Sequence, residues 1–212
     1  RKPPRVWWEQ LENSCTEVHG AMCGIVGYIG PRQAAGLLME GLKRLEYRGY
    51  DSSGIAVING SGLKIIKAAG KLSVLEQELK GRMPTGTVGI AHTRWATHGA
   101  PTSTNAHPHT DQSGRIALIH NGIIENSNAI RKTLEARGHT FKSETDTEVL
   151  AHLVGEFYQG NLEEALAAAL RDVDGAYGLA LLSSDEPGVL VAARKGSPLL
   201  VGVGENEFFV AS

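Results

Sequence analysis

Apolar residues recur along this chain with two spacings, and each spacing predicts one kind of element. Short apolar runs bounded by glycine or polar residues favour strands, and these lie at 24–29, 54–60, 62–68, 87–93, 115–120, 176–183, 188–194, 199–203 and 207–211. Apolar residues three and four apart predict helices, and these lie at 32–46, 71–80, 127–137, 146–158 and 161–171.

The order of these elements indicates a fold class. The sequence Asn-Gly-Ser-Gly at 59–62 separates two strand-like runs and is typical of a hairpin turn. Strands group toward both ends of the chain and most helices lie between them. We therefore expect an α+β domain in which helices pack outside antiparallel sheets.

Composition and charge exclude several classes of protein. With 42% hydrophobic and 21% charged residues, the chain has an ordinary globular composition. A net charge of −2 argues against nucleic acid as a partner, and no apolar run approaches the ~20 residues of a membrane span. Two cysteines and no secretory signal indicate a reducing compartment, so we expect a cytoplasmic protein.

Residues 1–22 differ from the rest of the chain. They hold two of the three tryptophans and a Pro-Pro pair, and they show no clear period. We expect a poorly ordered extension there, ahead of one domain at 23–212 that begins after Met22. The chain also stops inside an apolar run, so we expect it to be a piece of a longer protein.

Cys23 is the first candidate for chemistry, in the sequence Met-Cys-Gly-Ile-Val-Gly. A lone cysteine beside a strand is usually a buried structural residue. If Met22 were the start and were removed, however, the Cys23 thiol would share its residue with a free α-amine that can act as its base. Gly24 would let backbone approach closely. A dinucleotide-binding loop is disfavoured because Val26 stands where that fingerprint needs glycine.

Asn121-Gly122 follows a strand-like run and has two interpretations. Such a pair is usually a turn, and the segment taken alone favours that interpretation. Beside a nucleophilic cysteine, the Asn121 side-chain amide and the Gly122 backbone N–H could instead donate to a developing oxyanion.

The segment 92–109 is rich in histidine and contains one arginine after a strand. A metal site is conceivable, but neither an H-E-x-x-H nor a C-x-x-C pattern accompanies these histidines, which are His92, His98, His107 and His109. The planar guanidinium group of Arg94 could bind both oxygens of a carboxylate, and Trp95 could cover a pocket.

Asp146 lies where a helix is predicted to begin, after Ser143 and Thr145 and before Glu148. Acidic residues in a first helical turn are often only stabilising. A carboxylate there could also pair with a substrate ammonium. A substrate with an α-carboxylate, an α-ammonium and an acyl group would suit the whole set, and glutamine is such a substrate.

Longer motifs carry a resemblance to a known family. The motifs are MCGIVGYIG, LEYRGYDSSGIAV, GIAHTRWATHG, NAHPH, HNGIIEN, SETDTEVLAHL, GAYGLAL and ARKGSPLLVGVG, and together they span 23–212. In this order they resemble the glutaminase half of the glutamine–fructose-6-phosphate aminotransferases, which are class II glutamine amidotransferases. Amidophosphoribosyltransferases and asparagine synthetases share the Cys-Gly-Ile start, but the longer EYRGYDS and HTRWATHG strings resemble the aminotransferases rather than either of those families.

The resemblance implies an N-terminal-nucleophile hydrolase fold, a four-layer αββα sandwich, without metal or cofactor. It implies that Cys23 attacks the side-chain amide of L-glutamine and that its α-amine is the base, so the terminus must be free. The remaining roles that it implies are an oxyanion hole at Asn121 and Gly122, glutamine binding at Arg94, Trp95, Thr97, His98 and Asp146, and support at Arg48 and Gly24. In the whole enzyme, a homo-oligomer, a second domain would use the ammonia to convert fructose 6-phosphate to glucosamine 6-phosphate.

Two alternatives stay open. One is a metal-dependent amidohydrolase that uses His92, His107, His109 or His120. The other is a glutamine-binding or regulatory module in which residues 1–22 block Cys23.

Overall fold

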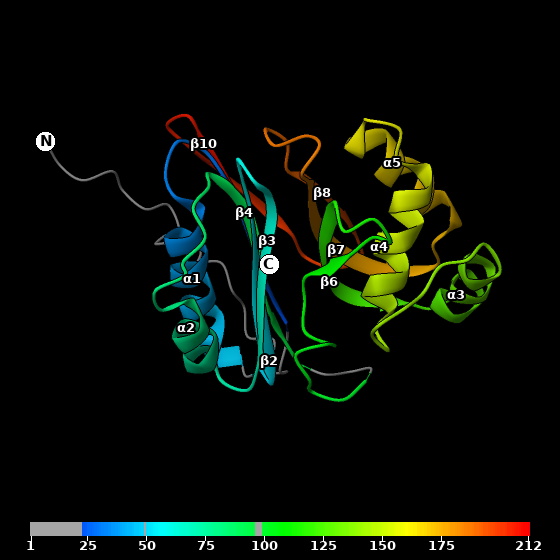
Figure 1. Ribbon diagram of the computed structural model, residues 1–212, viewed down its shortest axis with the longest axis horizontal. Coiled ribbons are helices and arrows are strands. Elements are labelled where there is room, and N and C mark those ends of the chain that lie inside the picture. Colours follow the sequence, from blue (N-terminus) through cyan, green and yellow to red (C-terminus); the bar gives the residue numbers. More distant parts are fainter. Residues whose placement is uncertain (1–22, 49, 96–98) are drawn as a thin grey trace, which may run out of the picture.

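Two antiparallel β-sheets lie face to face between two layers of helices in the computed structural model, which describes residues 23–48, 50–95 and 99–212 (Figure 1). The six-stranded sheet has the order β3-β2-β4-β1-β10-β9, with β1 Gly24–Ile29, β2 Ser52–Asn59, β3 Gly62–Ala69, β4 Val88–Arg94, β9 Leu200–Gly204 and β10 Glu207–Ala211. The four-stranded sheet has the order β5-β6-β7-β8, with β5 His109–Thr110, β6 Ile116–Ile124, β7 Gly175–Ser183 and β8 Val191–Lys195.

Each sheet is covered on its outer face by its own helices. Two pack on the six-stranded sheet, α1 Ala34–Leu45 and α2 Leu72–Leu79. Three cover the four-stranded sheet, α3 Ser127–Ala136, α4 Asp146–Phe157 and α5 Leu162–Ala169. Short 3₁₀ turns follow α1 at Glu46–Arg48 and α5 at Leu170–Asp172. In Figure 1 the two helical layers stand on opposite sides of the sheets.

Three apolar clusters hold the four layers together. One fills the space between the sheets and includes Ile25, Ile90, Ile119 and Leu182. The other two join each sheet to its helices. Burial of this apolar surface is the main favourable contribution to folding, and the arrangement confirms the expected αββα sandwich.

The local signals placed most elements correctly. Asn59 pairs with Gly62 across the β2–β3 turn, and its Oδ1 accepts hydrogen bonds from Ser61 N at 2.9 Å and Ser61 Oγ at 2.7 Å. This two-residue connection confirms the predicted hairpin. All five predicted helices are present, each within a few residues of its expected ends.

The interpretation of Asn121-Gly122 as a turn is wrong. Strand β6 continues through both residues to Ile124, with Asn121 opposite Gly178 and Gly122 opposite Tyr177 on β7. The paired strand supplies backbone partners that the local sequence does not reveal. The short strand β5 begins at His109, the last residue of the histidine-rich segment 92–109.

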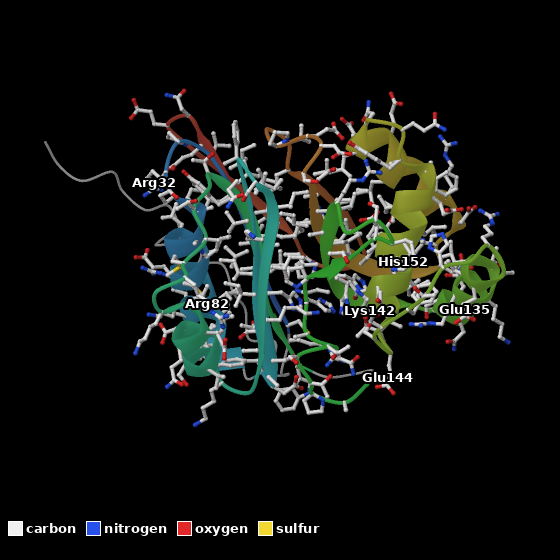
Figure 2. The ribbon with its side chains drawn as sticks, viewed as in Figure 1. Arg32, Arg82, Glu135, Lys142, Glu144 and His152 are labelled. Carbon is white, nitrogen blue, oxygen red and sulfur yellow. The ribbon has the colours of Figure 1, made fainter. Side chains whose placement is uncertain are left out.

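Many charged side chains lie on the outside of the sandwich, whereas Arg94 and Glu148 are buried. Figure 2 shows Arg32 and Arg82 beside the α1–α2 layer and Glu135 at the far side of the other helical layer. In the described part of the chain, no helix combines the length and apolar character needed to cross a bilayer.

Candidate active site

A cavity of about 260 Å³ opens where the ends of several elements meet. Its walls come from the start of β1, the end of β4, the middle of β6, the start of α4 and the loop after β8. The lining residues are Cys23, Arg94, Trp95, His107, His120, Asn121, Gly122, Ile123, Thr145, Asp146, Thr147, Ser197, Pro198 and Ser212. Of the predicted site residues, six therefore line one cavity: Cys23, Arg94, Trp95, Asn121, Gly122 and Asp146.

Cys23 is a free thiol at the edge of this cavity and is partly buried. Its Sγ accepts a hydrogen bond from Trp95 N at 3.2 Å, and its S–H faces the Trp95 carbonyl oxygen at 3.6 Å. Burial raises the pKa of the thiol, while the Trp95 hydrogen bond and the Arg94 charge oppose that rise only in part. The thiol in this setting needs a base to become a nucleophile at neutral pH.

The Asn121 side chain, on β6, hydrogen-bonds to Cys23, His92 and Ser212 of the other sheet's strands and their ends. Its Nδ2 donates to the Cys23 carbonyl oxygen at 3.0 Å and to Ser212 Oγ at 2.6 Å. Its Oδ1 lies 2.7 Å from His92 Nε2. The amide nitrogen therefore faces the cysteine, and the amide oxygen faces the histidine.

Gly122 has a backbone conformation that only glycine adopts readily. Its φ is +130°, and a Cβ at this position would lie 2.0 Å from the Ala176 carbonyl oxygen. The absence of a side chain keeps strand β6 paired and leaves the Gly122 backbone beside the cavity.

Arg94 and Trp95 form the wall next to Cys23. Arg94 ends β4 and is only 3% exposed, and its Nη2 donates to the Gly99 carbonyl oxygen at 3.4 Å. Trp95 is 45% exposed. A buried guanidinium beside an exposed indole can bind a carboxylate at a site that an aromatic ring partly shields from water.

Asp146 lies in the first turn of α4, as the sequence predicted. Thr145 caps this helix by accepting a hydrogen bond from Glu148 N at 3.3 Å. The Asp146 Oδ2 accepts from Ile124 N at 2.9 Å and lies 4.0 Å from His120 Nδ1. One carboxylate and one guanidinium thus face the same cavity, which suits a zwitterionic ligand.

The histidines around the cavity are buried and stack on one another. The ring centroids of His92 and His107 lie 4.2 Å apart at an interplanar angle of 30°, and His109 meets His107 edge-on at 5.1 Å. Burial lowers the pKa of His92 to about 3 and the pKa values of His107 and His109 well below the ordinary value. Across the described ranges, no three His, Cys, Asp or Glu side chains are grouped so that they could hold a metal.

Some predicted site residues are placed elsewhere or are not described. Thr97 and His98 lie outside the described residues, as does the whole extension 1–22, and Arg48 is described only as the end of a 3₁₀ turn. Gly24 begins β1, where a Cβ would lie 2.7 Å from Leu45 Cδ1 and 2.8 Å from Thr93 Oγ1. Close approach of neighbouring side chains thus explains this glycine.

Several lining residues were not predicted from the sequence as site residues. Thr147 donates to Asp146 Oδ1 at 3.4 Å, and Ser212 accepts from Asn121. Ser197 and Pro198 lie after β8 and reach the cavity from the far end of the chain. No local pattern marks them, because only the pairing of distant strands brings them to the cavity.

Comparison with known proteins agrees with this geometry. The sequence model of a family described as "Glutamine amidotransferase domain" matches residues 92–212. A glutamine–fructose-6-phosphate aminotransferase (isomerizing) of Thermus thermophilus is 61% identical over 192 residues, which is 90% of this chain and 32% of that protein. The chain thus spans about a third of the length of the curated relatives that it matches.

Two solved structures share the fold. One is glutamine phosphoribosylpyrophosphate amidotransferase from B. subtilis, with a TM-score of 0.77 and 28% identity over 89% of this chain and 41% of that chain. The other is described as the allosteric regulatory enzyme of purine biosynthesis, with a TM-score of 0.78 and 29% identity over 90% of this chain and 42% of that chain.

Proposed function

Because this chain belongs to the glutamine amidotransferase domain family, we propose that it hydrolyses L-glutamine to glutamate and ammonia, with Cys23 as the nucleophile. One observation carries the proposal: a single cavity brings together a thiol, an amide donor, a guanidinium and a carboxylate. These are the groups that a glutamine side-chain amide, α-carboxylate and α-ammonium need.

Glutamine would bind with its two α-substituents held at fixed points. The α-carboxylate would pair with the Arg94 guanidinium, and the α-ammonium with the Asp146 carboxylate at the start of α4. Trp95 would shield the bound substrate from solvent, with Thr97 and His98 in the same binding segment. Holding the α-carboxylate and the α-ammonium would direct the side-chain amide toward Cys23, which lowers the entropic cost of reaction.

Acyl transfer would proceed in two steps. The Cys23 α-amine takes the thiol proton as the sulfur attacks the amide carbon. The oxyanion that forms accepts hydrogen bonds from Gly122 N and from Asn121 Nδ2, whose N–H would turn from Ser212 Oγ to the oxyanion. The C–N bond then breaks, and ammonia leaves with a proton from the Cys23 α-ammonium, which leaves a γ-glutamyl thioester. Water activated by the same α-amine cleaves the thioester and releases glutamate.

The elevated pKa of the thiol supports a role for the α-amine. A protonated, partly buried thiol reacts slowly, and an α-amine with a pKa of roughly 7.7–8 is a suitable base near neutral pH. A peptide bond to Met22 would convert this amine to an amide that cannot accept the proton. Activity would therefore require a free terminus at Cys23, with residues 1–22 outside the 23–212 domain. Gly24 and Arg48 would support the terminal residue.

The whole protein would use the ammonia elsewhere. The relatives are named for transfer from glutamine to fructose 6-phosphate, and we extend that acceptor to the longer protein of which this domain would be one part. The product would be glucosamine 6-phosphate, made by a cytoplasmic homo-oligomer with no nucleic acid or membrane partner.

The first experiment measures glutamate and ammonia release from glutamine by two proteins. One is the full chain as printed, and the other is begun at Met22 so that methionine removal exposes Cys23. We expect activity only in the second, and we expect Cys23→Ala to reduce it at least 1,000-fold, given the magnitudes for nucleophile removal. Ser61→Ala in the Met22-initiated protein, on the exposed β2–β3 turn and outside the cavity lining, is the control and should keep full activity.

Three outcomes would contradict the proposal. Full activity of Cys23→Ala would exclude the thiol mechanism, and loss of activity with a chelator would favour a metal-dependent amidohydrolase. Glutamine binding by the Met22-initiated protein without ammonia release would instead favour a binding module.

A further inference from the structure

We propose that His92 is a positioning residue, which orients the Asn121 side-chain amide so that its nitrogen faces the oxyanion. This inference rests on the proposed function, because it assigns a role in the same oxyanion hole. His92 does not line the cavity and so would act only through Asn121.

The hydrogen-bond partners of Asn121 define the orientation of its amide. The Cys23 carbonyl oxygen can only accept, so the group 3.0 Å from it must be the Asn121 nitrogen. The Asn121 oxygen then points at His92 Nε2, 2.7 Å away. His92 must therefore donate through an Nε2–H, which fixes its neutral tautomer.

The surroundings of His92 hold this ring in place. The residue is completely buried on β4, where its backbone is paired with Ile25 on one side and Gly54 on the other. The His107 ring stacks against it at 4.2 Å. Within the described part of the chain, His92 Nδ1 has no hydrogen-bond partner. The His120 backbone also interacts with this ring, and Asn121 is the side chain that bonds to it.

The bond also joins the two sheets. His92 belongs to the six-stranded sheet and Asn121 to the four-stranded sheet. A donor on one sheet thus sets the rotation of an amide on the other. Since burial keeps the pKa of His92 at about 3, the ring remains a neutral donor throughout the neutral range.

Loss of the His92 donor would remove one of the constraints on Asn121. The Oδ1 atom would be left without its partner, and rotation of the amide would direct oxygen instead of nitrogen toward the developing negative charge. Catalysis would suffer at the transition state, whereas glutamine binding through Arg94 and Asp146 would not. The expected signature is therefore a lower kcat with little change in KM.

Three substitutions separate a positioning role from a merely structural one. His92→Gln can present an amide N–H near the place of Nε2, whereas His92→Asn can present one only near Nδ1, and His92→Phe presents neither. In the Met22-initiated protein, we expect His92→Gln to stay within about 3-fold of the parent. We expect kcat to fall about 10- to 100-fold in the other two, which is at or below the usual effect of removing an oxyanion donor.

A double-mutant cycle with Asn121→Ala gives the decisive test. If His92 acts through Asn121, adding His92→Phe to Asn121→Ala should cause no further loss of kcat. Urea unfolding of every variant shows whether it folds, and kcat is compared among folded variants. Should His92→Phe fail to fold, the comparison of His92→Gln with His92→Asn decides.

The outcomes separate the two proposals. An active parent with additive effects in the cycle, or equal kcat in the Gln and Asn variants, overturns the role of His92 and leaves the glutaminase proposal intact. A folded parent that releases no ammonia overturns the proposed function and, with it, this role.

Discussion

The buried histidines predict a steep loss of stability in mild acid. His92, His107 and His109 are each less than 6% exposed, and burial lowers their pKa values far below the ordinary value. The folded protein therefore keeps all three neutral at pH 5. The unfolded chain protonates them, because a free histidine has a pKa of about 6.5.

The sign and size of the effect follow from proton linkage. Between the two pKa values the unfolded state binds more protons, so the free energy of unfolding falls as the pH falls. For one histidine, moving from pH 7 to pH 5 costs about 2 kcal/mol of stability. Three histidines cost about 6 kcal/mol, which is comparable to the whole stability of many domains.

Urea unfolding followed by circular dichroism, repeated from pH 7 to pH 5, measures this loss. Near pH 5, the free energy of unfolding should fall by about 4 kcal/mol for each unit by which the pH is lowered. This is the sum of roughly 1.4 kcal/mol from each of the three histidines. His120 and His152, whose pKa values are also lowered by burial, can only add to the slope. His107→Asn should reduce the slope by about 1.4 kcal/mol per unit.

A control distinguishes linkage from simple destabilisation. Val57 is fully buried and does not titrate, so Val57→Ala should lower the free energy of unfolding by a similar amount at every pH. A slope below about 1.4 kcal/mol per unit in the parent would refute the reasoning, because the histidines would then be ionising within the folded protein.

Two further predictions concern the site itself. Gly122→Ala would place a methyl group 2.0 Å from the Ala176 carbonyl oxygen, so we expect lower stability and at least a 100-fold loss of kcat. Gly138→Ala is its control, since Gly138 also has a positive φ but no atom within 4 Å of the added carbon; equal effects would exclude a special role for position 122. Asp146→Asn keeps an acceptor for the Ile124 N–H but loses the charge, and we expect KM for glutamine to rise about 10- to 100-fold with kcat less affected. The control is Glu164→Gln, which removes an acidic residue from the first turn of α5 and should leave KM unchanged. A normal KM in Asp146→Asn would show that Asp146 does not bind glutamine.

Local sequence signals predicted the elements well, because they are local in origin. The Asn59–Gly62 turn and the Thr145 cap depend on side chains within three residues of the backbone groups that they bind. The Asn121-Gly122 pair failed as a turn because its conformation is set by β7, more than 50 residues away in sequence. A turn signal contains no information about a strand that pairs with it.

The site divides in the same way. Cys23, Arg94 and Asp146 could be predicted as cavity residues, because each has a reactive or charged side chain at the end of an element. The contact between Asn121 and Ser212 was not, because it depends on the two sheets stacking. The histidines suggested metal ligands from their number alone, whereas the described ones stack in a buried group.

The position of β1 bears on how the domain folds during synthesis. This first strand lies between β4 and β10, and Val26 pairs with Ala211. At roughly 5–20 residues per second, a ribosome needs on the order of 10–40 s to add the residues between them. One edge of β1 therefore stays unpaired until β10 has emerged from the ribosome. The Asn121 contact with Ser212 can form only then, so the cavity is completed only after β10 has been synthesised.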